Sequence, residues 1–203
     1  DKVLLPIMAV LNSSIAKYYA SCISETLNFE VGVLAKIPIH KNIFDNTELV
    51  DLVQENIALA KTEWDNYEIS FEFSKHPLIG SSKYLENCFE NWSEYAKQRY
   101  ERVSSNEDRI NQILIDAYDV ADSINYTADD TEITLRFASK EADIKSLISY
   151  LVGVEMGRYS LDVEGIAFAG GEWNPMKYVT YQPDNDGIIP VYTQLGMQDG
   201  LTA

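Results

Sequence analysis

Residues 82–103 read SKYLENCFENWSEYAKQRYERV, and this stretch decides the fold class of the chain. Its apolar and aromatic side chains recur every three or four positions, which is the spacing of one face of an α-helix. They are Tyr84, Leu85, Cys88, Phe89, Trp92, Tyr95 and Tyr100. The pattern predicts the longest helix of the chain over 82–103 and places Trp92 in the core.

Helical patterns continue toward the C-terminus. The run Ser104-Ser105-Asn106-Glu107 has the residue types of a helix N-terminus, which predicts a separate helix over about 106–120. Ser139, followed by apolar residues at helical spacing, predicts a further helix that ends near Gly157.

Helical patterns also precede the central stretch. Apolar residues at helical spacing cover 3–24, and the polar run Asn12-Ser13-Ser14 interrupts them, so that a second helix can begin at Ser13 or Ser14. A cap between Asp45 and Thr47 predicts another helix, which continues through Ala60.

Strand patterns are short and few. Alternating apolar residues and turn residues predict strands near 27–39, 132–137 and 165–192. The expected fold class is therefore α+β and helix-dominated, with amphipathic helices and short strands.

The charge is negative and unevenly distributed. The whole chain carries a net charge of −16, which repels phosphate and argues against a protein that binds nucleic acid unaided. Residues 1–61 hold five lysines and seven carboxylates, for a net charge of −2, whereas residues 62–203 hold the remaining −14. Any contact with DNA is therefore expected in the first third of the chain.

Several features indicate the cellular setting. No apolar run approaches the ~18 residues of a membrane span, so no membrane partner is expected. The chain opens on Asp1 without a secretory signal and is interpreted as the interior of a longer polypeptide. Cys22 and Cys88 lie in apolar surroundings far apart in the sequence, which predicts buried, reduced thiols and a cytoplasmic protein.

The sequence contains none of the common catalytic motifs: no nucleophile elbow, no Walker-type loop and no dinucleotide-binding glycine motif. His40 and His76 lack partners at zinc-ligand spacing. The run Asp184–Gly187 resembles the start of a calcium loop, but Ile188-Ile189-Pro190 follow it, which favours a tight turn. We therefore expect no catalytic, cofactor-binding or metal-binding residue in this chain.

Three groups of segments, in this order, resemble one family. The first group is LNSSIAKYY (11–19), TLNFEVG (26–32) and LAKIPI (34–39). The second is AKTEWD (60–65) and FSKHPL (73–78), and the third is DIKSLISY (143–150), GRYSLD (157–162) and AGGEW (169–173). Together they resemble the C-terminal region of BREX-type, PglX-like adenine-specific DNA methyltransferases and of related fused restriction–modification enzymes.

The resemblance implies a division of the chain and a role for the full-length protein. Residues 1–42 would be the distal part of a DNA target-recognition domain, and residues 43–203 an acidic helical C-terminal extension. The full-length enzyme would transfer a methyl group from S-adenosylmethionine to the N6 atom of adenine in a specific sequence of double-stranded DNA, as part of a phage-defence system. The fragment alone would be neither an enzyme nor a binder of the cofactor.

The family's catalytic loop has an Asn-Pro-Pro-aromatic sequence, which lies upstream in these proteins. Asn174-Pro175-Met176-Lys177 departs from it at its last two positions, where Met and Lys replace the second proline and the aromatic residue. We interpret Asn174-Pro175 as a turn, and no catalytic residue is carried over to this chain.

Six short polar or cationic residues are the candidate DNA contacts, because such side chains and helix N-termini commonly bond phosphate oxygens. They are Asn12, Ser13, Lys17, Asn28, Lys36 and Lys41. The alternative is an acidic helical protein-interaction module that docks another subunit of a defence complex, which the charge of residues 62–203 favours.

Overall fold

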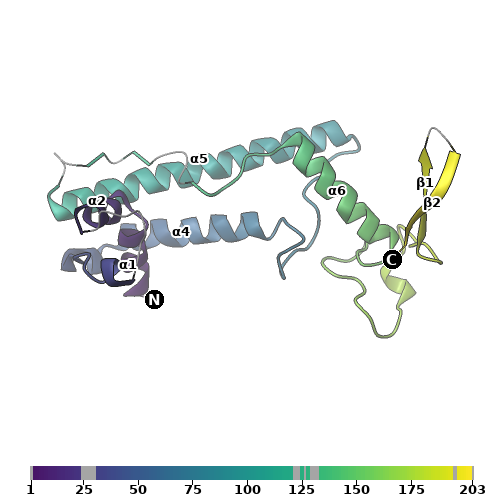
Figure 1. The fold of residues 1–203 in the computed structure, drawn as a ribbon, viewed down its shortest axis with the longest axis horizontal. Coiled ribbons are helices and arrows are strands. Elements are labelled where there is room, and N and C mark those ends of the chain that lie inside the picture. Colours follow the sequence, from purple (N-terminus) through teal and green to yellow (C-terminus); the bar gives the residue numbers. More distant parts are fainter. Residues whose placement is uncertain are drawn as a thin grey trace. The chain divides into compact units, whose positions relative to one another are not determined.

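The computed structural model describes residues 2–23, 31–120, 124–125, 127–128, 133–193 and 196–202, with side chains described as far as residue 189. Helices dominate it, as predicted. The chain divides into two compact units (Figure 1). The first unit comprises residues 1–62 and 95–137, and the second comprises residues 63–94 and 138–203.

The first unit is helical throughout its regular structure. Its elements are α1 (Leu4–Leu11), α2 (Ser14–Ile23), α3 (Val31–Leu34), the 3-10 helix η1 (Lys41–Asp45), most of α4 (Thr47–Trp64) and the part of α5 (Leu85–Tyr118) that begins at Tyr95. Figure 1 shows α4 running alongside this part of α5, with α1 and α2 near one end of the pair.

The predicted interruption between the first two helices is confirmed. α1 ends at Leu11 and α2 begins at Ser14. Two side-chain bonds stabilise the junction: the Ser13 hydroxyl donates to the Val10 carbonyl at 2.7 Å, and the Asn111 side-chain oxygen accepts from the Ser14 backbone N–H at 2.9 Å. Local polar residues end the first helix, and a residue distant in sequence caps the second.

The largest departure from expectation is α5, which runs unbroken from Leu85 to Tyr118. The prediction of two helices, over 82–103 and about 106–120, is wrong at their boundary. Asn106 does not cap a new helix, because its side-chain amide donates to Glu55 and Asn56 of α4. Residues 104–106, whose types favour helix caps, therefore lie inside the helix. Hydrogen bonds from Asn106 to another helix take the place of a local capping bond.

The core of the first unit joins the N-terminal helices to the first half of α4 and the end of α5. Its buried apolar side chains are Ala9, Val10, Ile15, Ala16, Ile37, Ile43, Leu49, Val53, Ile110, Ile113, Leu114 and Ile115. Helix α4 begins where predicted, because the Asn46 side-chain oxygen accepts from the Leu49 backbone N–H at 3.0 Å.

The second unit is built on α6 (Lys140–Glu155), which begins at the predicted cap. The Ser139 hydroxyl accepts from the Ala142 N–H, and the Ser139 N–H donates to Asp143. Trp92 is buried as predicted, at 6% exposure, and its indole N–H donates to Asp143 at 3.1 Å. The carboxylate of Asp143 thus serves both the helix start and the core tryptophan.

Aromatic rings fill the rest of this core. Tyr150 and Tyr159 stack with centroids 5.0 Å apart, and Phe73 meets Tyr150 and Tyr159 edge-on. Tyr159 comes this close to α6 at Gly153, where an added Cβ would lie 2.6 Å from its ring.

The strand predictions are confirmed only at the C-terminal end. β1 (Ile188–Thr193) pairs antiparallel with β2 (Gly196–Thr202), Ile188 opposite Thr202 and Thr193 opposite Gly196. Near 27–39, residues 31–34 form a helix instead, and 24–30 lie outside the described residues. Residues 133–137 and 166–181 contain no strand, because turns and an isolated extended segment there find no pairing partner.

Two turn predictions are confirmed. Asn174 caps the 3-10 helix η2 (Pro175–Lys177), since its side-chain oxygen accepts from the Met176 N–H at 3.0 Å. The carboxylate of Asp184 accepts from the backbone N–H groups of Asp186 and Gly187, which closes a tight turn.

The prediction of two buried thiols is wrong for Cys22, which is exposed on α2, and right for Cys88.

Within the described residues, no helix has both the length and the apolar content that a membrane crossing requires.

Candidate nucleic-acid interface

Five of the six candidate DNA contacts lie in the first unit, and Asn28 lies outside the described residues. Asn12 is exposed at the C-terminus of α1, and Lys17 is exposed on α2. Lys36 follows α3 and Lys41 begins η1, both exposed. The three lysines are therefore exposed residues in the least acidic part of the chain.

Ser13 differs from the others because it is buried, at 1% exposure. Its hydroxyl is bonded to the Val10 carbonyl, and the N-terminus of α2 is already capped by Asn111. Asn111 also accepts from the Ser14 hydroxyl at 3.1 Å. A phosphate would have to displace Asn111 to reach this helix end, so the cationic side chains are the better candidates.

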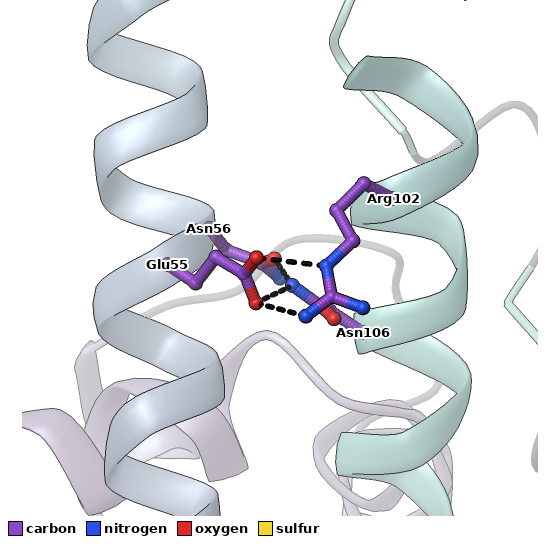
Figure 2. A network of polar contacts seen from close by, with 4 residues as sticks. All are labelled: Glu55, Asn56, Arg102 and Asn106. Atoms are coloured by element: carbon purple, nitrogen blue, oxygen red, sulfur yellow. Dashed lines mark hydrogen bonds and ion pairs between the residues drawn. The ribbon is translucent and has the colours of Figure 1, made fainter. Parts of the chain in front are cut away.

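A line of polar contacts between α4 and α5 was not predicted from the sequence. Arg102 donates to both carboxylate oxygens of Glu55, at 2.7 and 2.8 Å. The buried Asn106 amide donates to Glu55 at 3.0 Å and to the Asn56 side-chain oxygen at 2.8 Å (Figure 2). We call these residues, with Glu48, Glu107 and Arg109, the polar seam.

The seam repeats two helical turns along each helix. Arg109 donates to both oxygens of Glu48, at 2.6 and 2.9 Å. The pairing of early residues of α4 with late residues of α5 makes the two helices antiparallel. Hydrogen bonds from the arginines lower the pKa of the Glu48 and Glu55 carboxyls, so both pairs are charged near neutral pH.

A matched spacing could have revealed the seam. The two glutamates of α4 and the two arginines of α5 are each separated by two helical turns, as facing charged positions of a coiled-coil-like pair would be. The seam holds the helices in one register. It contains no nucleophile with an adjacent base, and no cluster of three or more His, Cys, Asp or Glu side chains able to hold a metal occurs in the described part of the chain.

The amino-acid sequence was compared with known protein families and with curated proteins. No family model matches the chain. Its relatives are adenine-specific methyltransferases several times its length.

The two relatives are PglX of Lacticaseibacillus casei (strain Zhang) and BrxX of Escherichia coli O9:H4 (strain HS), each named an adenine-specific methyltransferase. PglX is 31% identical over 192 residues, which cover 92% of this chain and 16% of PglX. BrxX is 32% identical over 220 aligned positions, which cover 97% of this chain and 18% of BrxX. The chain is thus a PglX-like segment, and it spans about a sixth of the length of the curated relatives it matches.

Proposed function

We propose that this chain is a non-catalytic DNA-recognition and accessory segment of an S-adenosylmethionine-dependent, site-specific N6-adenine DNA methyltransferase of a cytoplasmic phage-defence system. The observation that carries the proposal is the similarity to adenine-specific methyltransferases along nearly the whole chain. Methyl transfer and cofactor binding then belong to the rest of the full-length protein.

The exposed lysines of the first unit support a contact with double-stranded DNA. Lys17, Lys36 and Lys41 belong to residues 1–61, whose net charge is only −2. Three phosphate contacts are too few for independent affinity, since each contributes a salt slope of only about −0.9. The full-length protein would supply most of the binding, and residues 1–42 would extend its recognition domain.

Charge reversal in the full-length protein tests this contact. Replacing Lys17, Lys36 and Lys41 by Glu should weaken DNA binding. It should also reduce the slope of the logarithm of the binding constant against the logarithm of the salt concentration, by the contribution of up to about three phosphate contacts. The matched control reverses three exposed lysines of the second unit: Lys83, Lys140 and Lys145. Equal losses from both sets would mean that net charge alone matters, and the proposed location would be wrong.

The assignment of cofactor binding and methyl transfer to the rest of the full-length protein has its own test. Calorimetry with S-adenosylmethionine, and a radiolabelled methyl-transfer assay, should give no signal with this chain alone. Saturable binding of the cofactor would contradict a non-catalytic segment.

A second candidate function is docking of another subunit of the defence system. The charge of −14 on residues 62–203 favours it, as do large apolar side chains exposed after α4, with Ile69 at 67% and Phe71 at 106% exposure. Replacing Ile69 and Phe71 by Ser should abolish subunit assembly and leave DNA affinity unchanged if docking is the function. Loss of DNA affinity without loss of assembly would favour the first candidate.

A further inference from the structure

The first unit contains a cavity of about 400 Å³. Its described lining residues come from α1 and Asn12, from α4 and α5, and from Ala128 and residues 133–135, all of which belong to the first compact unit. This volume is within the range of small-molecule sites, which are mostly apolar and contain a few placed polar groups.

Most of the wall is aliphatic. Met8, Val53, Ile57, Val103, Ile110 and Leu135 contribute apolar surface. None of the described residues that line the cavity is aromatic, so they offer no ring for stacking. A flexible aliphatic body suits this lining better than a planar ring, since dispersion and burial of CH₂ groups need no particular orientation.

Polar residues interrupt the aliphatic wall: Asn12, Asn56, Asn111, Thr134 and one carboxylate, Glu107. Glu107 lines the cavity, and its Oε1 accepts a hydrogen bond from Asn56 Nδ2 at 2.8 Å. The neighbouring arginines are engaged elsewhere, Arg102 with Glu55 and Arg109 with Glu48. Across the described residues, no ion pair to Glu107 is formed, in contrast to the two paired glutamates of the seam.

Burial raises the pKa of Glu107, and the nearby Asp108 charge adds to this, while the hydrogen bond from Asn56 acts in the opposite direction. The charged form of Glu107 is therefore poorly compensated by the protein itself. A cation in the cavity would offset that cost.

We propose that this cavity binds an organic cation that has an aliphatic body and a protonated nitrogen, with Glu107 as the counter-ion. The aliphatic wall receives the body, and the carboxylate of Glu107 accepts from the ammonium group. A free alkylamine and a lysine side chain on a peptide share this chemistry. The cavity does not involve Lys17, Lys36 or Lys41, although the candidate DNA contact Asn12 is one of its lining residues.

Calorimetric titration of the chain with n-hexylammonium tests the site, with hexan-1-ol and methylammonium as matched probes. Hexylammonium should bind saturably at one site. Hexan-1-ol lacks the charge and so loses one charge-assisted hydrogen bond, whereas methylammonium lacks the body and so loses the burial of CH₂ groups. Each should therefore bind at least about tenfold more weakly. Hexan-1-ol binding as tightly as hexylammonium would overturn the proposal.

Two variants distinguish binding at this cavity from the general attraction of cations to an acidic protein. Glu107→Gln should weaken hexylammonium about tenfold or more and leave hexan-1-ol unchanged. Glu101→Gln removes the same charge from an exposed position of α5 and should change neither. Equal effects of the two variants would refute a specific counter-ion.

If Glu107→Gln fails to fold, Ala60→Leu provides the second test, because Ala60 lines the cavity from an exposed position of α4. The added side chain should reduce hexylammonium binding, and unchanged binding would refute the location. Nα-acetyl-lysine N-methylamide distinguishes the sources: binding comparable to hexylammonium assigns the site to a lysine on a peptide, and much weaker binding assigns it to a free amine.

Discussion

Arg102 donates two parallel hydrogen bonds to the carboxylate of Glu55, and so joins α5 to α4 in a fixed register. The pair itself is largely exposed, which limits its contribution to stability. The buried member of the same network is Asn106, at 2% exposure, which bonds Glu55 and Asn56. A buried polar residue of this kind can specify the alignment of two helices at some expense of stability.

We expect Asn106→Ala to lower the free energy of unfolding by about 1–3 kcal/mol, because the half-buried side-chain oxygen of Asn56 loses this donor. Urea denaturation measures the change. Gln112→Ala is the control on the same helix, since the bond from Gln112 to Asp116 lies at the surface, and it should stay within about 0.5 kcal/mol. Equal effects would show that the network is not a stabilising one.

The continuity of α5 can be tested at Ser105, which is exposed within the helix. Ser105→Pro should destabilise the first unit by about 3 kcal/mol or more, because proline removes an intrahelical bond and clashes with the preceding turn. Ser105→Ala should be neutral or slightly stabilising. If both variants were equally stable, two helices would meet at this point, as the sequence alone predicts.

His76 is expected to make the stability of the second unit depend on acid pH. It is buried at 3% exposure, its Nδ1 accepts from the Leu78 N–H, and Nε2 therefore donates to the Ser146 hydroxyl at 2.8 Å. Burial lowers the pKa of His76 to about 4, although the charge of Glu68 opposes the shift. The neutral imidazole therefore fits this buried site better than the protonated one.

Between pH 6.5 and about 4 the unfolded chain protonates this histidine and the folded chain does not. The stability from neutral His76 is thus fully present above pH 6.5 and is lost as the pH falls, on the order of 2–3 kcal/mol. Denaturation of the wild type and His76→Gln across this range should give stability differences that shrink toward acid pH. His40→Gln, at an exposed site, is the control. A constant difference would contradict the mechanism.

Gly153 is expected to resist substitution despite its place in a helix. A Cβ there would lie 2.6 Å from Tyr159 Cδ2 and 2.8 Å from Cε2. Alanine should gain about 1 kcal/mol of helix propensity and lose about 1–3 kcal/mol to overpacking, so Gly153→Ala should destabilise the second unit. Gly32→Ala, in α3, should be neutral or stabilising, because no atom of the described residues lies within 4 Å of the added Cβ. Thermal unfolding measures the stability of both variants. A lower stability of Gly32→Ala than of Gly153→Ala would contradict the prediction.

Local sequence rules located most helix ends correctly. The starts of α4 and α6 follow from Asn46 and Ser139, whose side chains bond backbone groups within a few residues. The break before Ser14 was likewise visible in the polar run, although its cap, Asn111, was not. A cap formed by a neighbour in sequence can be predicted from one segment, whereas a cap from a distant helix requires the folded chain.

The candidate DNA contacts divide in the same way. Residue type and charge distribution single out Lys17, Lys36 and Lys41, and the structure leaves them exposed. Ser13 has the same polar character, but its burial depends on how α1 and α2 pack, which no local pattern records. The functional boundary proposed at residue 42 stays a prediction.

The sequence by itself determined that this chain is helix-dominated, acidic beyond its first third and similar to a segment of adenine-specific methyltransferases, because composition, periodicity and residue identity are local properties. Only the tertiary structure decided that α5 passes unbroken through 104–106, that the polar seam forms, and that Glu107 faces an aliphatic cavity. The physical reason is competition: polar side chains that can end a helix locally instead bond to another helix, once packing of the apolar faces brings the two together.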